Sequence, residues 1–190
     1  MTILPITIYG EPVLHEVAEP ITEITDQVRT LVADMFETMD AAPGVGLAGP
    51  QVGVGKRIFV YAWDEPGISV RDVAINPELW MLPTVPESIE ELDEDEETEG
   101  CLSFPGERFP LRRSERVLLR ATNLDGERYE LEAEGWLARI LQHEYDHLDG
   151  VIYIDRLQGN DYKTAQKLLR KHRWGIPGCT WLPGVDDLEG

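Results

Sequence analysis

A helical pattern from about Glu134 to Asp149 constrains the fold more than any other part of the chain. The pattern begins with an acidic residue, as helix N-termini favour, and Gly150 follows it as a stop signal. Residues at three- and four-residue spacings give this helix one packed side: Leu137, Ile140, Leu141, Glu144 and Leu148. Such a helix must pack this side against other structure.

The segments before this helix are predicted to be mainly β-strands. Arg57 to Trp63 has the composition of a buried strand. Arg116 to Asn123 and Glu127 to Ala133 flank Leu124-Asp125-Gly126, a turn sequence, and are predicted to pair as a hairpin.

Two more helices are predicted, one near each end. Thr25 is suited to cap the first, which ends before Pro43-Gly44, and the second runs from about Asn160 to Trp174. Strands followed by a helix that they enclose, without regular alternation, predict an α+β fold. We expect antiparallel or mixed sheets around a central helix, with an N-terminal and a C-terminal helix.

Length favours one domain, because 190 residues with 42% hydrophobic content can form one sizeable core. We assign residues 1–174 to this domain and residues 175–190 to a C-terminal tail. Glu87 to Glu99 holds nine acidic residues in thirteen. A block of like charges repels itself, so a solvated insertion is predicted at about residues 85–98.

Charge and cysteine content exclude several classes of protein. A net charge of -19 argues against DNA binding. No apolar run approaches the ~20 residues that cross a bilayer, and the first residues lack a secretory pattern, so we expect a cytoplasmic protein with no membrane contact. Cys101 and Cys179 are too few for a disulfide framework, which leaves a thiol free for chemistry.

The strongest chemical signal is His143-Glu-Tyr-Asp-His147, within the predicted central helix. Two histidines four residues apart project from one helical face, so both can bind one metal ion, and Glu144 can act on water there. Two surface histidines without a function would give the same pattern. The apolar neighbours Leu137 and Ile140 favour a buried metal site, whereas Asp146 is expected behind the ligands or in solvent.

Catalytic sites of this kind usually have three protein ligands, so a third must lie elsewhere. A zinc metalloprotease is the main alternative, but Tyr153 stands where its extended motif has a third histidine. His15 and His172 lie among charged residues. Cys101, within Glu99-Gly-Cys-Leu-Ser103, is the better candidate, since a metal-bound thiol is already deprotonated. A lone cysteine between apolar residues is, however, more often a small buried hydrophobe.

A third motif, Gly44-Val-Gly-Leu-Ala-Gly-Pro-Gln51, follows the first helix. No Lys-Ser or Lys-Thr follows its last glycine, so it does not match phosphate-binding loops. Glycines let a backbone approach a ligand closely, and the Gln51 amide can donate a hydrogen bond to an oxyanion. A tight turn into the strand at 57–63 explains the glycines equally well.

Together these stretches resemble the peptide deformylase family, whose members carry a Gly-rich motif ending in Gln, then Glu-Gly-Cys-x-Ser, then His-Glu-x-x-His. The resemblance covers roughly residues 3 to 173. An accidental match would have to succeed at each motif independently. The resemblance implies a metal-dependent amide hydrolase that removes the formyl group from formyl-methionine of newly made polypeptides and releases formate.

The resemblance also implies a role for each motif. The implied ligands of a divalent ion, typically Fe²⁺ with Zn²⁺, Ni²⁺ or Co²⁺ as substitutes, are Cys101, His143 and His147. Glu144 would take a proton from water and deliver it to the departing amine. The Gln51 amide and the Leu102 N–H would stabilise negative charge on the formyl oxygen.

In the family the substrate, a formyl-methionyl nascent peptide, lies as an added strand against main-chain groups, which here belong to Val45, Gly46 and Gly100. Val45 is expected to line the pocket for the first side chain. Trp136 and Arg139, within two turns of His143, are further candidates for this pocket or for helix packing.

One residue departs from the pattern: Gly49 stands where the family usually has Ala, which predicts a looser turn before Gln51. Two other functions stay open. A zincin-like metalloprotease would need a further ligand, and a non-catalytic structural metal-binding module would have no need of Glu144.

The predicted helix at 160–174 has a basic face formed by Lys163, Lys167, Arg170 and Lys171. The opposite side carries Tyr162, Ala165, Leu168 and Leu169. An ordinary solvated helix has the same pattern. In the family the terminal helix can dock on ribosomal RNA, so the resemblance implies a ribosome contact through this helix.

Overall fold

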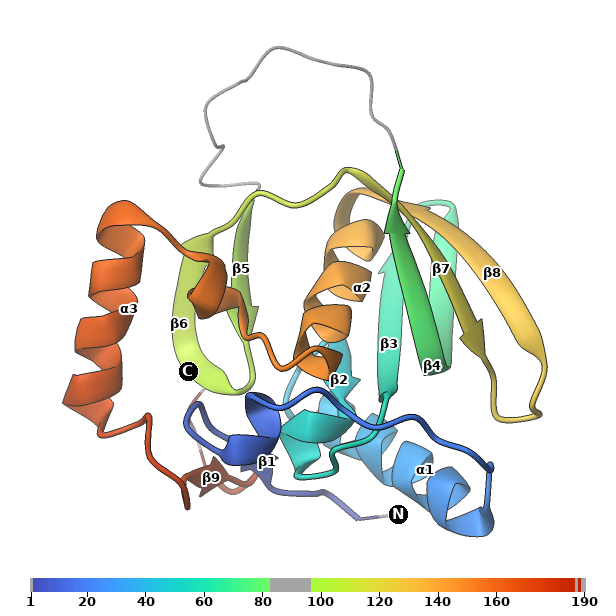
Figure 1. Ribbon diagram of the computed structural model, residues 1–190, viewed down its shortest axis with the longest axis horizontal. Helices are drawn as coiled ribbons and strands as arrows, with labels where there is room; N and C mark the ends of the chain where they lie inside the picture. Colours follow the sequence, from blue (N-terminus) through green and yellow to red (C-terminus); the bar gives the residue numbers. More distant parts are fainter. Residues whose placement is uncertain (1, 83–96, 187, 189–190) are drawn as a thin grey trace.

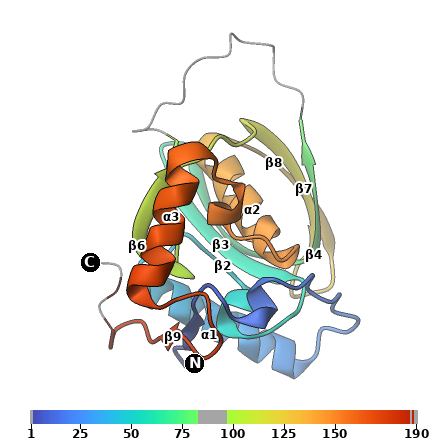
Figure 2. The same cartoon turned by 60° about the vertical axis from the view of Figure 1, so that its left-hand side comes forward.

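The predicted α+β architecture is present in the computed structural model, which describes residues 2–82, 97–186 and 188 (Figure 1). Its centre is helix α2 (Gly135–Leu148), in the segment predicted as the central helix. All five side chains expected on its packed side are at most 4% exposed. A curved sheet lies on one side of α2 and a short β-hairpin on the other (Figures 1 and 2).

The curved sheet has five antiparallel strands in the order β2-β3-β4-β7-β8. They are β2 (Gly46–Ala48), β3 (Ile58–Glu65), β4 (Ile68–Met81), β7 (Arg116–Thr122) and β8 (Arg128–Glu134). The predicted hairpin is β7–β8, whose turn is stabilised by Asn123: its side-chain oxygen accepts hydrogen bonds from the N–H groups of Asp125 and Glu127. Apolar side chains of this sheet and of α2 form one core cluster.

On the other side of α2, strands β5 (Thr98–Cys101) and β6 (Phe104–Pro110) form a two-stranded antiparallel hairpin. A second core cluster fills the space between this hairpin, the 3-10 helix η3 (Tyr153–Arg156) and helix α3 (Gly159–His172). Ala165 and Leu169 face that cluster as expected. Tyr162 is 44% exposed, so the packed stripe of α3 is narrower than predicted.

Helix α1 (Asp26–Ala41) packs below the sheet, and Thr25 caps it as predicted by accepting a hydrogen bond from the Val28 N–H at 3.4 Å. The 3-10 helices η1 (Pro12–Leu14) and η2 (Gly49–Val52) lie nearby. Strands β1 (Ile6–Thr7) and β9 (Thr180–Trp181) pair as a short antiparallel ribbon. This terminal ribbon joins the two ends of the chain (Figure 1).

The three predicted helices, the strand at 57–63 and the hairpin agree with the structure to within two residues at each end. Strand β4 and the β5–β6 hairpin have no counterpart among the predicted elements. The acidic insertion expected at about 85–98 falls mostly on residues 83–96, outside the described residues. The domain limit at 174 stays a prediction, although β9 of the tail pairs with β1. Within the described ranges, no helix has the length and apolarity needed to cross a membrane.

Candidate metal centre

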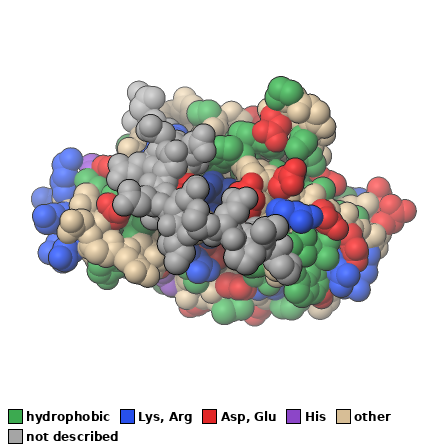
Figure 3. All heavy atoms as spheres, turned by 90° about the horizontal axis from the view of Figure 1, so that it is seen from above, with side chains coloured by type: hydrophobic (Ala, Val, Ile, Leu, Met, Phe, Trp, Pro, Cys, Tyr) green, Lys and Arg blue, Asp and Glu red, His purple; other side chains and the backbone are tan. Residues whose placement is uncertain are grey.

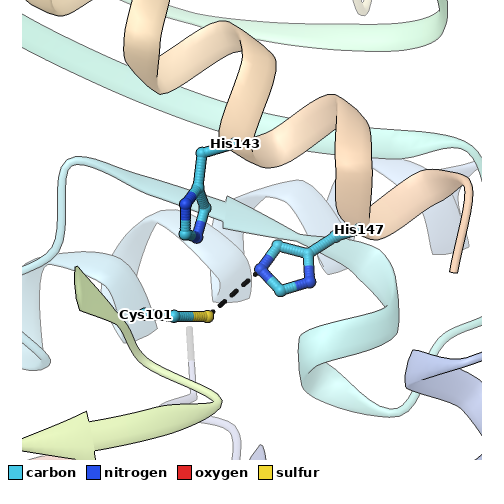
Figure 4. Close-up of side chains that lie close together, drawn as sticks. All are labelled: Cys101, His143 and His147. Atoms are coloured by element: carbon cyan, nitrogen blue, oxygen red, sulfur yellow. Dashed lines mark hydrogen bonds between the residues drawn. The ribbon is translucent and has the colours of Figure 1, made fainter. Parts of the chain in front are cut away.

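Helix α2 and strand β5 bring three potential metal ligands together (Figure 4). His143 and His147 project from one side of α2, and Cys101 faces them from the end of β5. One ligand atom of each lies within 4.8 Å of the others, and Cys101 Sγ is 3.3 Å from His147 Nε2. This is the ligand set that the sequence motifs predict.

The donor set fits a divalent transition metal, because a thiolate and two imidazoles suit such ions. Burial, together with the charge of His143, lowers the pKa of His147 well below its usual range, which keeps this imidazole in the neutral form that a ligand needs. Burial opposes the charged form of His143, but Cys101 and Glu99 raise its pKa well above its usual range. Because Cys101 and Glu99 favour a positive charge at His143, they also favour a metal cation beside it.

Glu144 lies next to this trio and is 4% exposed. Its Oε2 atom is buried and has no hydrogen-bond partner among the described residues. Burial, reinforced by the charge of Glu99 and opposed by His143, raises the pKa of Glu144 to about 7. Gly46 gives the carboxylate its room, since a Cβ at that position would overlap Glu144. A buried carboxylate with a pKa near neutrality, and with one oxygen that has no hydrogen-bond partner among the described residues, is suited to accept and release a proton.

Gln51 and Leu102 occupy positions suited to polar contact with a bound carbonyl group. The Gln51 side-chain oxygen accepts a hydrogen bond from the Ala48 N–H at 2.8 Å, and its Nε2 lies 3.7 Å from Cys101 Sγ. This bond fixes which end of the amide faces the metal site. Leu102 follows the cysteine directly and lines the same cavity as Gln51.

A cavity of about 310 Å³ opens beside the candidate metal ligands. Val45, Gly46 and Gly100 line it, as the resemblance implies, and so do Trp136 and Arg139. The Trp136 ring stacks on Trp63, with ring centroids 6.1 Å apart. Trp63 and Arg108 also line the cavity, and neither is indicated by the sequence motifs.

Comparisons with known proteins now decide the family. A family model described as polypeptide deformylase matches residues 3–163. Peptide deformylase 2 of Corynebacterium efficiens is 46% identical over 188 residues, which cover 98% of this chain and 96% of that protein. A peptide deformylase of Rhodococcus opacus is also 46% identical, over 196 residues that cover 100% of this chain and 98% of that one. The chain belongs to the polypeptide deformylase family.

Solved structures of peptide deformylases share the fold. The enzyme of Ehrlichia chaffeensis, in complex with actinonin, gives a TM-score of 0.78 at 34% identity and covers 91% of this chain and 99% of that one. The enzyme of Thermotoga maritima gives a TM-score of 0.70 at 41% identity, with 84% and 100% covered. The predicted fold class and family are therefore confirmed.

Behind the candidate ligands, this deformylase-family chain holds a buried network of charged side chains. Glu99 accepts hydrogen bonds from His143 Nδ1 at 3.1 Å, from Arg113 Nη2 at 2.6 Å and from Arg139 Nη1 at 2.9 Å. Burial alone would raise the pKa of Glu99, but the bonds from His143 and Arg113 lower it well below its usual range. An ionised carboxylate on Nδ1 fixes the ring orientation and leaves Nε2 for a metal.

Asp146 continues this network and is 7% exposed, so it lies behind the candidate ligands rather than in solvent. Its carboxylate accepts hydrogen bonds from Arg113 Nη1 and from Arg156 Nε, each at 2.6 Å. Motif spacing does not indicate Arg113 or Arg156, because each meets Asp146 only after the chain has folded. Glu99 had a weak signal, as the acidic residue two positions before the cysteine.

Proposed function

We propose that this chain removes the formyl group from formyl-methionine at the amino terminus of new polypeptides, using one divalent ion held by Cys101, His143 and His147. As a member of its family, the chain is a metal-dependent hydrolase that acts on formylated nascent peptides. The observation that carries the assignment to these residues is the close trio of ligand atoms beside Glu144, whose Oε2 has no hydrogen-bond partner among the described residues.

The ion would supply Lewis acidity, which lowers the pKa of water so that hydroxide, the nucleophile for a carbonyl group, is available near neutral pH. The proposal of Fe²⁺, with Zn²⁺, Ni²⁺ or Co²⁺ as substitutes, rests on the family resemblance. It agrees with the softness of a thiolate and two imidazoles. Nδ1 of His143 is hydrogen-bonded to Glu99. The orientation of the His143 ring toward the ion would therefore be fixed before the ion binds.

Glu144 would transfer the proton of the reaction. Its pKa of about 7 allows it to take a proton from the attacking water and to return it to the departing amine nitrogen. Formate and a peptide with a free amino group would then be released. The burial of Glu144 keeps bulk water from competing for that proton.

The negative charge that develops on the formyl oxygen would be stabilised by the Gln51 amide and the Leu102 N–H. Support for Gln51 comes from its fixed orientation, with the oxygen held by Ala48 and Nε2 on the side of Cys101. Donors that are aligned before the reaction need no reorganisation as charge forms, which is where such groups lower a barrier most.

The substrate peptide would bind as an extra strand along β2, which is an edge strand of the five-stranded sheet. Gly46 of β2 and Gly100 of β5 line the cavity and would offer main-chain groups to it. Val45 would contact the methionine side chain. Main-chain pairing does not read side chains, so sequences after the first residue would be tolerated broadly.

One experiment separates this function from its alternatives. The purified protein is loaded with Fe²⁺ under anaerobic conditions and mixed with a formyl-methionyl peptide, with the acetyl-methionyl peptide as a matched control. We expect formate and a new free amine from the first peptide only. Internal fragments would indicate a metalloprotease, and metal binding without formate would indicate a structural module. Glu144→Gln should keep the metal and lose ~10²–10⁴ in rate.

We further propose that α3 contacts the ribosome, and thus that the enzyme acts in the cytoplasm on chains as they emerge. All four basic side chains of its outer face are exposed. Basic side chains gather at the edge of the molecule that α3 forms (Figure 3). Such a contact should weaken as salt rises, because counterions return to the phosphates.

Charge reversal tests this contact. Changing Lys163, Lys167, Arg170 and Lys171 to Glu should lower co-sedimentation with ribosomes at low salt. Activity on a free formyl peptide should not change. Reversal of Arg116, Arg120 and Arg128 on the distant β7–β8 hairpin serves as the control and should leave co-sedimentation intact. Binding that survives the α3 substitutions would limit this helix to covering the core.

A further inference from the structure

The terminal ribbon of β1 and β9 lies beside the loop that carries Cys101. Ile6 is paired with Trp181, and Thr7 with Thr180. Trp181 is 3% exposed, and its indole N–H donates a hydrogen bond to the carbonyl oxygen of Leu102 at 2.8 Å. Trp181 lies beyond residue 163, where the match to the family model ends. The C-terminal tail therefore contacts the backbone next to a candidate metal ligand.

The peptide group between Leu102 and Ser103 connects Trp181 to the sulfur of Cys101. In a trans peptide the C=O and the N–H point in opposite directions, and the described residues contain no cis peptide. The C=O of this group accepts the bond from Trp181, and its N–H, that of Ser103, lies 3.4 Å from Cys101 Sγ and donates to it. A bond to the C=O also polarises the group and strengthens its N–H as a donor.

The same ribbon anchors a second donor to that sulfur. Gln51 Nε2 lies 3.7 Å from Cys101 Sγ. The hydroxyl of Thr7 lies 3.1 Å from the backbone oxygen of Gln51 and donates to it. Just after β1, the Tyr9 N–H donates to the backbone oxygen of Ser103 at 2.8 Å. The two donors to Cys101 thus belong to segments whose backbone is hydrogen-bonded to the terminal ribbon or to Tyr9 beside it.

We propose that Trp181 is a positioning residue for the metal-binding sulfur of Cys101 and acts through the Leu102–Ser103 peptide. Hydrogen bonds to a ligand sulfur orient it and reduce the electron density that it gives to the metal. The C-terminal tail thus sets the orientation and donor strength of one ligand. This inference rests on the proposed function in one respect, namely that Cys101 binds the metal.

The test compares Trp181→Phe with Trp174→Phe in Co²⁺-loaded protein. Phe at 181 keeps an aromatic ring and removes the N–H. Trp174 packs edge-on against Phe104, with centroids 5.4 Å apart, so its replacement disturbs packing near the same loop without touching the Leu102 bond. Two quantities are measured without substrate: the sulfur-to-cobalt charge-transfer absorption and the rate of cobalt loss to a chelator.

We expect Trp181→Phe to shift the charge-transfer band, because the sulfur loses part of its hydrogen bonding. Cobalt loss should become about tenfold faster, because a sulfur that is less firmly oriented holds the ion less well. The kcat should fall while KM changes little. Trp174→Phe should match the parent in both cobalt measurements. Equal behaviour of the two variants, or an unshifted band in Trp181→Phe, overturns the proposal.

Two further results keep the outcome decisive. If Trp181→Phe does not fold, the benzothienyl analogue of tryptophan at 181 keeps both rings and lacks only the N–H, and it must show the same shift. If the parent itself has no sulfur-to-cobalt band, Cys101 is not a ligand and the inference fails with it. Formate release by the parent then shows separately whether the proposed reaction survives.

Discussion

On the β5 side of α2, charged side chains fill the space behind His143, whereas on the β2 side, glycines leave space for Glu144. The charged side consists of Glu99, Arg113 and Asp146, all at most 10% exposed at their side chains. The glycine side is the run 44–51, where a Cβ at Gly46 would overlap the Glu144 carboxylate. On one side, ion pairs hold Glu99 against the candidate ligand His143. On the other, the absence of a side chain at Gly46 leaves room for Glu144, the proposed proton carrier.

The difference concerns what each group must do. A metal ligand must keep one orientation, and several hydrogen bonds to one carboxylate provide it. A proton carrier must change its charge in each turnover, and fixed ionic partners would oppose one of its two forms. Glu144 accordingly has no hydrogen bond at Oε2 within the described residues, whereas Glu99 accepts hydrogen bonds from two arginines and from His143.

The largest expected effect comes from breaking the glycine side. Gly46→Ala places a Cβ where the Glu144 carboxylate lies, so the carboxylate must move. We expect the rate to fall by about 10²–10⁴, the range for loss of a positioned proton carrier, with metal content unchanged. The measurement is formate release together with metal analysis. Gly55→Ala is the control, since a Cβ there makes ordinary contact with Val13; equal losses in both variants would refute the steric explanation.

A substitution on the charged side should lower the affinity for the metal instead of the rate of proton transfer. Glu99→Gln keeps the shape but removes the charge that faces His143 and Arg113. We expect metal affinity to fall by roughly 10–100-fold, as for other groups that hold a ligand. Competition with a chelator measures it. Glu97→Gln, at a more exposed pair with Arg112, is the control and should change affinity little. If Glu99→Gln kept full affinity for the metal, the charged side would not be what positions His143.

The sequence predicts the part of each side that depends on local spacing. His143, His147 and Glu144 could be identified because a helix has a fixed period, which puts them on one face whatever surrounds it. Cys101 followed from the need for a third ligand and from the resemblance. These positions are brought together in the structure, while their chemical roles stay predictions until they are measured.

The rest depends on contacts that no local pattern encodes. Arg113 meets Glu99 across 14 residues and Asp146 across 33, and Trp181 meets Leu102 across 79. Strand β4 contains Asn76 and Pro77 within its length, and its register to β7 shifts there, so no regular alternation marks it. Pairing partners of this kind are decided by the whole fold, not by the segment.

A smaller effect, on stability, is expected from Gly49 on the glycine side. Gly49 was expected to loosen the turn before Gln51, but a Cβ at Gly49 would lie 2.8 Å from the Val54 oxygen and 2.9 Å from the Lys56 oxygen. Both are backbone atoms, so Gly49 allows a close approach of two segments. Gly49→Ala should therefore cost about 1–3 kcal/mol of stability, with little gain or loss in rate. Urea unfolding measures it, and a stabilised variant would restore the loose-turn explanation.

The smallest effect is a loss of stability at alkaline pH that we expect from the glycine side. Tyr61 is paired with Gly46 in the β2–β3 register, and its hydroxyl is 3.3 Å from that of Tyr129. Burial raises the pKa of Tyr61 to about 12; the hydrogen bond with Tyr129 opposes this rise, and the charge of Asp72 adds to it. In the unfolded chain a tyrosine hydroxyl has its ordinary pKa of ~10. Stability from Tyr61 is therefore fully present below that pH and is lost as the pH rises toward 12.

Urea unfolding at pH 8 and pH 11 tests this assignment. The parent should lose on the order of 1 kcal/mol through Tyr61 between these values. Tyr61→Phe should be slightly less stable at pH 8, because its hydrogen bond to Tyr129 is gone, but should fall less on going to pH 11. Tyr162→Phe, at an exposed position on α3, should fall like the parent. An equal fall in Tyr61→Phe would mean that alkaline loss of stability arises away from the glycine side.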